Sequence, residues 1–290
     1  MKVIFNADDF GITDAVSTSI IELFRDKTPL KSATVMINII SDSSVELLKE
    51  FMKKDGRSGY SAGLHFNLTC GRPVSPAHEV PSLIDGEGFF LKFKNLITGA
   101  ARADIDSSEV LREFKAQIES FYDKLGFYPS HIDSHKHVHM LPQFFAAVTA
   151  GIKNFGINKI RLTQNISASE LFLSQGIERE TVDACFKGVC ESFYYDDSSA
   201  PALLYPQAFL GTYSVGALSA PVFEKEISGY ADKDITCEYM THPGVCDESL
   251  KKLSGLLQPR EHEFAALKSI ELKEILKKYN IEIMSFNDLN

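Results

Sequence analysis

Apolar residues recur along the chain in two alternating patterns. Short apolar stretches rich in Val, Ile and Phe are typical of buried strands, and between them apolar residues recur every three or four positions, as in amphipathic helices. The predicted strands are 2–8, 32–38, 61–69, 131–137, 159–163, 207–213, 237–242 and 281–286. The predicted helices are 14–26, 44–54, 107–126, 142–156 and 261–279. Gly126 and Gly156 suit helix C-caps, and Pro142 suits a first helical turn.

This alternation of strand and helix predicts parallel strands joined by crossover helices. Eight strands in 290 residues indicate an α/β fold, a (β/α)-barrel or a distorted version of one. No linker divides the chain, so we expect a single domain over residues 1–290. Residues 71–106, rich in proline and glycine, break the pattern and predict an insertion that either covers substrate or is a surface excursion. The stretch 164–206 gives mixed signals.

Composition narrows the class of protein. Hydrophobic residues at 44% and charged residues at 24% are ordinary for a globular protein. A net charge of -9 argues against a nucleic-acid or anionic-membrane partner. The start MKVIFNADDFG lacks the apolar core of a signal peptide, and no apolar run has the length of a membrane helix. Five scattered cysteines without a CxxC fit a reducing compartment. We therefore expect a cytoplasmic protein, and the sequence allows a homodimer without indicating one.

Polar side chains gather where the predicted strands end. In parallel α/β folds, the carboxyl ends of the strands carry the active site. These ends bring titratable or amide side chains to one rim: Asn6, Asp8, Asp9, His65, Asn67, the run HIDSHKHVH at 131–139, Arg161 and His242. The repeated coincidence of polar residue and strand end predicts a site there.

Each of these residues also has a plainer interpretation. Asp8 and Asp9 are either a metal ligand beside a free base or a solvated pair before a helix. A lone strand histidine such as His65 is more often a core residue, and His242 is either a turn residue or a proton donor. Of the run at 131–139, we interpret His131 and His139 as structural.

One aspartate and two histidines around a divalent metal would suit hydrolysis of an amide or ester. Histidines two positions apart can reach one metal, and a ligating histidine usually gives its other N–H to a carboxylate, which makes Asp133 a supporting residue. Nucleotide-binding, serine-hydrolase and zincin motifs do not occur.

Four longer motifs carry a family resemblance. They are NADDFG (6–11), GLHFNLT with the following G-x-P (63–73), HIDSHKHVHMLP (131–142) and THPG (241–244). In this order, over most of the chain, they resemble the YdjC/ChbG carbohydrate deacetylases. Lesser matches are SLIDGEGFF (82–90), Arg161 and the late segment with Arg260, Glu261 and Glu263.

The resemblance implies a barrel-like fold related to NodB-type polysaccharide deacetylases. It implies metal-dependent removal of the N-acetyl group from small amino sugars, such as chitobiose-type disaccharides or their phosphates. The metal ligands that it implies are Asp9, His65 and His135, with Asp8 as the catalytic base. The metal is Zn²⁺ or Mg²⁺, between which the sequence does not choose.

The remaining site residues are expectations of our own. We expect His242 to be the general acid, and Arg161, Asn67 and His137 to contact the substrate. Two alternatives stay open: a metal-dependent phosphoesterase, and a non-catalytic sugar-binding protein of the same fold.

Overall fold

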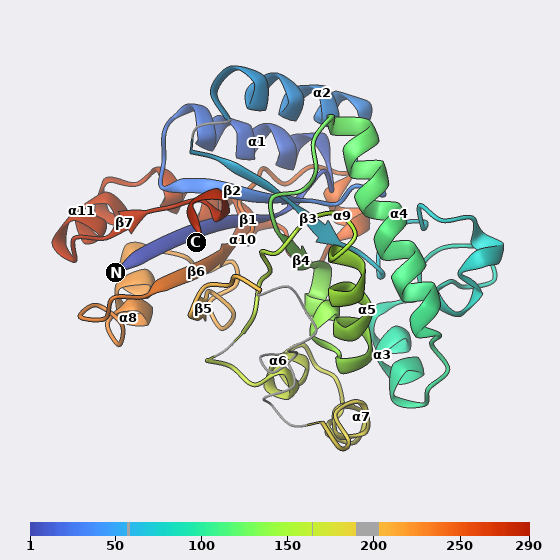
Figure 1. Ribbon diagram of the computed structural model, residues 1–290. Coiled ribbons are helices and arrows are strands. Elements are labelled where there is room, and N and C mark those ends of the chain that lie inside the picture. The colour runs from blue at the N-terminus through green and yellow to red at the C-terminus, as the bar shows by residue number, and fades with distance from the viewer. Residues whose placement is uncertain (57–58, 164, 190–202) are drawn as a thin grey trace.

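A curled, wholly parallel sheet organises the chain (Figure 1). The computed structural model describes residues 1–56, 59–163, 165–189 and 203–290. The strand order is β4-β3-β2-β1-β6-β5, and β7 pairs with the start of β1. The strands are β1 (Lys2–Phe10), β2 (Leu30–Val35), β3 (Ser61–Phe66), β4 (Ile132–Ser134), β5 (Ala208–Leu210), β6 (Thr236–Thr241) and β7 (Glu282–Ile283). The α/β barrel-like prediction is confirmed in its distorted form.

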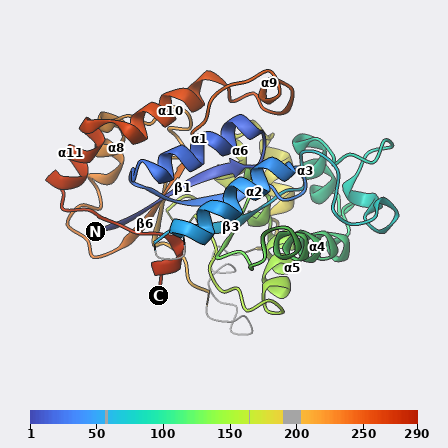
Figure 2. The ribbon, with the colours of Figure 1, turned by 90° about the horizontal axis from the view of Figure 1, so that it is seen from above.

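Helices cover the sheet on its outer side. Helices α1 (Asp14–Arg25) and α2 (Asp42–Phe51) lie together over β1 and β2, and α4 (Ser107–Leu125) and α5 (Pro142–Ile152) lie beside the β3–β4 edge (Figures 1 and 2). The others are α3 (Phe93–Ala101), α6 (Ala168–Ser174), α7 (Arg179–Cys185), α8 (Ala220–Ile227), α9 (Leu250–Leu253), α10 (Gln258–Lys268) and α11 (Ile270–Lys278). No helix in the described part of the chain is long and apolar enough to cross a membrane.

Local chemistry explains why the strongest elements form where predicted. β1 is buried along all but its first residue, as its near-continuous apolar run requires. α4 begins after Asp106, whose side chain accepts from the Ser108 N–H, and ends at Gly126, which has a left-handed φ of 81°. Pro142 occupies the first turn of α5 as expected. α5 ends at Ile152, before the Gly156 predicted as its cap.

Several predicted elements are shorter or broken. The predicted strand 159–163 is reduced to isolated bridges at Lys159 and Ile160. The predicted strand 131–137 ends at Ser134, because the chain turns into the 3₁₀ segment His135–Met140. The predicted helix 261–279 is two helices, since Ser269 is extended and caps α11. Within 164–206, residues 164 and 190–202 lie outside the described part of the chain.

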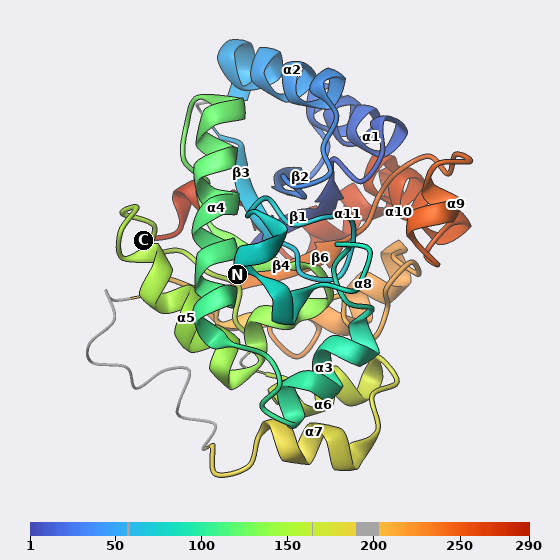
Figure 3. The ribbon, with the colours of Figure 1, turned by 90° about the vertical axis from the view of Figure 1, so that its right-hand side faces the viewer.

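The insertion 71–106 is an ordered excursion beside α4 (Figure 3). It contains two 3₁₀ turns, an antiparallel bridge between Ile84 and Phe90, and α3. Acidic side chains of α4 hold it: Glu113 accepts the backbone N–H groups of Val74 and Ser75, each at 2.9 Å. The insertion is therefore held by buried carboxylates of α4 and by apolar residues of its own, such as Val80, Leu83 and Leu96, that join the main hydrophobic core.

Gly63 of β3 lies in close contact with the ring of His131. A Cβ on Gly63 would lie 2.5 Å from the ring of His131, which stacks on Phe286 with ring centroids 3.7 Å apart. His131 is fully buried in this stack, which agrees with the structural role expected for it. His139 is fully buried too, between the Ser134 hydroxyl and the Arg161 carbonyl, as expected.

Candidate metal centre and active site

A cavity of about 480 Å³ opens at the carboxyl ends of the strands. Its wall comes from β1, β3, the segment after β4, α6, the loops after β5 and β6, and the first turn of α10. Six of the predicted site residues line it: Asp8, Asp9, His65, His135, His137 and His242. No residue of the insertion 71–106, all of which is described, lines this cavity, so the substrate-covering interpretation gains no support from it.

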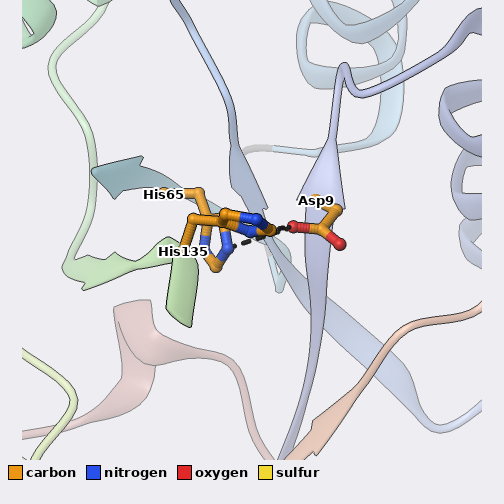
Figure 4. A group of neighbouring side chains, drawn as sticks. All are labelled: Asp9, His65 and His135. Carbon is orange, nitrogen blue, oxygen red and sulfur yellow. Dashed lines mark hydrogen bonds and ion pairs between the residues drawn. The ribbon is translucent and has the colours of Figure 1, made fainter. Parts of the chain in front are cut away.

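Asp9, His65 and His135 meet at one point of the cavity (Figure 4). Asp9 Oδ1 lies 3.2 Å from His65 Nε2 and 3.0 Å from His135 Nδ1. The ligand atoms of the three side chains all lie within 4.8 Å of one another. One carboxylate oxygen and two imidazole nitrogens form a donor set that divalent zinc accepts readily and magnesium less readily. The three residues therefore fit the metal that the resemblance implies.

An irregular end of β1 aims Asp9 at this point. The pairing of β1 with β2 shifts register between Ala7 and Phe10, and Asp9 has a left-handed φ of 64°. Two adjacent aspartates would otherwise point to opposite faces. The distortion lets Asp8 and Asp9 line the same cavity in different surroundings.

Arg260 of α10 holds the other oxygen of Asp9. Its Nη2 donates to Asp9 Oδ2 at 2.5 Å. Burial opposes ionisation of Asp9, but Arg260 and His135 outweigh it and hold the pKa of this carboxyl well below its usual range. Asp9 is thus a carboxylate with Oδ1 turned to the histidines.

Asp133 orients His65. Its Oδ1 lies 2.7 Å from His65 Nδ1, and its Oδ2 accepts the Thr34 hydroxyl at 2.9 Å. With Nδ1 facing a carboxylate, His65 presents Nε2 to Asp9. Burial disfavours the charged ring, but Asp133 and the other carboxylates outweigh it and raise the pKa of His65 to about 10. The surroundings of this ring attract positive charge strongly.

His135 begins the 3₁₀ segment after β4 and has different surroundings. Lys136 and His137, which follow it, have left-handed φ angles of 58° and 56°. This turn breaks the period-2 side-chain pattern of the strand, so His137 lines the same cavity but is not part of the group of Asp9, His65 and His135. Burial, only partly offset by Asp9, lowers the pKa of His135 and keeps the ring neutral, as a metal ligand must be.

Asp8 is held by an arginine rather than by the histidines. Arg161 Nη1 and Nη2 each donate to one Asp8 oxygen at 2.7 Å, and Asn6 Nδ2 donates to Oδ1 at 2.8 Å. Burial opposes ionisation, but Arg161 outweighs it and lowers the pKa of Asp8 well below its usual range. Asp8 is therefore ionised, next to the three-residue cluster but not part of it.

The expectation that Arg161 contacts substrate is wrong in this structure. Arg161 is fully buried and does not line the cavity. Its donors are taken by Asp8, by Glu238 Oε1 at 2.6–2.8 Å, and by Asp133 at 3.0 Å. Arg161 lies behind Asp8 because three buried carboxylates need a cation there.

The expectation for Asn67 also needs correction. Asn67 is fully buried and is not part of the cavity wall. Its Nδ2 donates to Asn38 Oδ1 and to the Cys70 carbonyl, and its Oδ1 accepts the N–H groups of Thr69 and Cys70. An amide with its donors and acceptors used this way shapes the loop after β3 rather than contacting a ligand.

His242 and His137 each have one ring nitrogen without a hydrogen-bond partner. Both residues line the cavity, and the unpartnered atom of each is its buried Nδ1. Burial lowers the pKa of His242 to about 4 and that of His137 well below its usual value. Glu263 accepts the His242 backbone N–H at 2.5 Å, which fixes the turn that carries this histidine.

A second group of possible metal ligands shares His65. It consists of Asp8, His65 and Asp133. Its two carboxylates already face the Arg161 guanidinium, 2.7 and 3.0 Å from Nη2. A cation in that position is supplied by the chain, so the Asp9 group is the better metal site.

Sequence reasoning missed several contributors. Glu238 is a fully buried acid in an apolar strand, and that placement was a readable signal of an internal cation. Arg260 appeared only as a lesser motif match. Thr212 and Tyr213, on the cavity wall after β5, carried no signal at all.

Comparisons with known proteins agree over the whole chain. The model of the family described as YdjC-like protein matches residues 2–278. Relatives named carbohydrate deacetylase from Clostridium beijerinckii and Listeria monocytogenes are 31% and 30% identical to this chain, with all of both chains covered in each case. A solved structure from Enterococcus faecalis, named as a candidate cellobiose-phosphate cleavage protein, is 27% identical with a TM-score of 0.76. The match covers 98% of this chain and 97% of that one.

Proposed function

The chain belongs to the YdjC-like protein family, and from that premise we propose that it is a metal-dependent carbohydrate deacetylase acting on small amino sugars. The observation that carries the proposal is the pairing of two unlike aspartates on one cavity wall. Asp9 meets two histidines, whereas Asp8 is ionised and held apart by Arg161. A protein that only bound sugar would not require the second carboxylate.

Asp9, His65 and His135 would hold the metal. When bound, a divalent ion would act as a Lewis acid on the amide carbonyl and on a water molecule. Asp133 holds the proton of His65 on Nδ1, so that only the Nε2 proton, which the raised pKa of this ring implies, would leave on metal binding, and Arg260 keeps Asp9 Oδ1 turned toward the histidines.

Asp8 and His242 would move the protons. Asp8 takes a proton from the attacking water as the new C–O bond forms at the acetyl carbon. The C–N bond then breaks, and His242 gives a proton to the departing amine, so that the products are acetate and a free amino sugar. Because burial lowers the pKa of His242 to about 4, its ring starts neutral, so the proton that it gives to the amine must be the one that the attacking water releases to Asp8, passed on within the site.

The substrate class follows from the relatives and the cavity. Two relatives are named carbohydrate deacetylase, and the solved structure is named for a sugar phosphate. A cavity of about 480 Å³ is in the range for small-molecule sites. We propose a chitobiose-type disaccharide or its phosphate, with Zn²⁺ or Mg²⁺ as the metal.

The decisive experiment measures acetate release from N,N′-diacetylchitobiose and its 6-phosphate, with protein stripped of metal and reloaded with Zn²⁺ or Mg²⁺. Asp8→Asn should lower kcat by about 10²–10⁴-fold, the usual contribution of a general base, while metal and sugar still bind. Equal loss of metal would show that Asp8 and Asp9 have exchanged roles.

The same assay separates the alternatives. Phosphate release without acetate would indicate a phosphoesterase. Sugar binding without release of either product, from metal-loaded protein, would indicate a binding protein and refute the proposal.

A further inference from the structure

Arg260 reaches the cavity from α10 with a guanidinium that is only partly used. The residue is 1% exposed and lines the cavity. Its Nε donates to the Leu256 carbonyl at 3.0 Å, and its Nη2 donates to Asp9 Oδ2 at 2.5 Å. Its Nη1 is buried and has no hydrogen-bond partner.

Unpartnered polar atoms are concentrated around this cavity. Eight buried side-chain atoms in the described part of the chain lack a partner. Four of them belong to cavity-lining residues, namely His137 Nδ1, Thr212 Oγ1, His242 Nδ1 and Arg260 Nη1. Buried polar groups are nearly always satisfied, so this concentration indicates atoms that a bound ligand would pair.

Arg260 differs from the other three in what it can offer. A guanidinium is always charged and has only donors, so its free Nη1 requires an acceptor on the ligand. The histidines and the threonine can each donate or accept, and therefore do not define the ligand group. Arg260 is thus the member of the set that specifies an oxygen.

We propose that Arg260 binds the amino sugar of the proposed reaction directly, with Nη1 donating to a hydroxyl or carbonyl oxygen while Nη2 holds Asp9. This inference rests on the proposed function and names a further substrate-binding residue for it. Both nitrogens belong to one planar, rigid group, so the substrate oxygen is set at a fixed place relative to Asp9 and the histidines. A lysine has one ammonium nitrogen and cannot hold both positions in this fixed geometry.

The competing interpretation is that Arg260 only neutralises buried Asp9. In that case the arginine would matter for metal binding and stability, and not for sugar affinity at a given metal occupancy. The two interpretations therefore separate when sugar and metal binding are measured independently of turnover.

The test uses the slow Asp8→Asn protein loaded with Zn²⁺, and isothermal titration with N,N′-diacetylchitobiose. Adding Arg260→Met should weaken sugar binding by about tenfold or more, as expected for a lost hydrogen bond from a charged group, with one equivalent of metal still bound. Arg260→Lys keeps the charge beside Asp9 and should bind sugar nearly as weakly. Arg112→Met removes an arginine of α4 that pairs with Glu79 away from the cavity and should change neither measurement.

Two outcomes would overturn the inference. One is unchanged sugar affinity in Arg260→Met with metal bound, and the other is a loss of sugar binding only in proportion to lost metal. If the protein that retains Arg260 binds no amino sugar at all, the proposed function fails and the inference with it, so the two failures are distinguishable.

Discussion

Replacing Asp133 with Asn should weaken metal binding without removing a metal ligand. Asp133 Oδ2 accepts from Thr34 Oγ1, Arg161 Nη2 and Asn6 Nδ2 at 2.9, 3.0 and 3.4 Å. Its Oδ1 faces His65 Nδ1 at 2.7 Å. An asparagine can offer an oxygen to only one of these two sides.

Either orientation of the amide damages the site. Because three donors converge on the Oδ2 side, the amide oxygen should settle there and the NH₂ group should face His65. The ring must then accept at Nδ1 and carry its proton on Nε2, which is the atom that faces Asp9. The opposite orientation would place the NH₂ group against three donors.

Loss of such a supporting partner usually weakens metal affinity 10–100-fold, or about 1.4–2.7 kcal/mol. Competition between the metal-free protein and a chromophoric chelator for Zn²⁺ measures it. Asp8→Asn is the matched control: it too removes a carboxylate paired with Arg161, but that carboxylate does not hydrogen-bond to His65. A folded Asp133→Asn protein with unchanged Zn²⁺ affinity, or an equal loss in Asp8→Asn, would refute the reasoning.

Three other predictions test separate parts of the structure. Burial, against the pull of Arg161, raises the pKa of Glu238 from 4.5 to about 7. Its contribution to the free energy of unfolding is therefore fully present below pH 4.5 and is lost as pH rises through 7. Glu238→Gln should remove this loss, worth roughly 3 kcal/mol, when the free energy of unfolding is measured with urea across that pH range. If the free energy of unfolding of the variant and of the unaltered protein changed with pH in the same way, the prediction would be contradicted. Gly63→Ala should lower the free energy of unfolding by about 1–3 kcal/mol by displacing the His131 ring, and an unchanged Tm would count against this packing. Tyr213, 73% exposed on the cavity rim, offers an aromatic face for a sugar ring. Tyr213→Ala should weaken sugar binding by about 0.5–1.5 kcal/mol, whereas Tyr213→Phe, which keeps the ring, should not. Equal sugar affinities of the two variants in titration calorimetry would exclude this contact.

Much of the fold was readable because it depends on local patterns. The continuous apolar run of β1 and the capped amphipathic repeat of α4 specify their elements from nearest neighbours alone. The segment 159–163 was not readable in the same way. Its composition is that of a strand, but in the structure the segment forms only two isolated bridges, to Ile132 of β4 and to Leu204. These bridges place Arg161 behind Asp8.

The site residues, too, were predictable only where a local sequence pattern marks them. Strand-end motifs predicted Asp8, Asp9, His65, His135 and His242, and all five line one cavity. The supporting role of Asp133 agrees with its contact to His65. The two substrate contacts that the structure corrects, Arg161 and Asn67, are polar residues whose partners lie far along the chain or in the next loop. Sequence reasoning could place them near the site but could not count the hydrogen bonds they already make.

The sequence by itself determined which chemical groups stand at the strand ends, because apolar runs and the polar residues that end them are local properties of the chain. Only the tertiary structure decided which atoms face one another. The parallel order of β4, β3, β2 and β1 brings residues 9, 65 and 135 together, and the left-handed backbone at Asp9 turns one oxygen to the histidines and the other to Arg260. Burial then assigns the charges, because in a water-poor interior each carboxylate depends on the cation or donor that the fold places beside it.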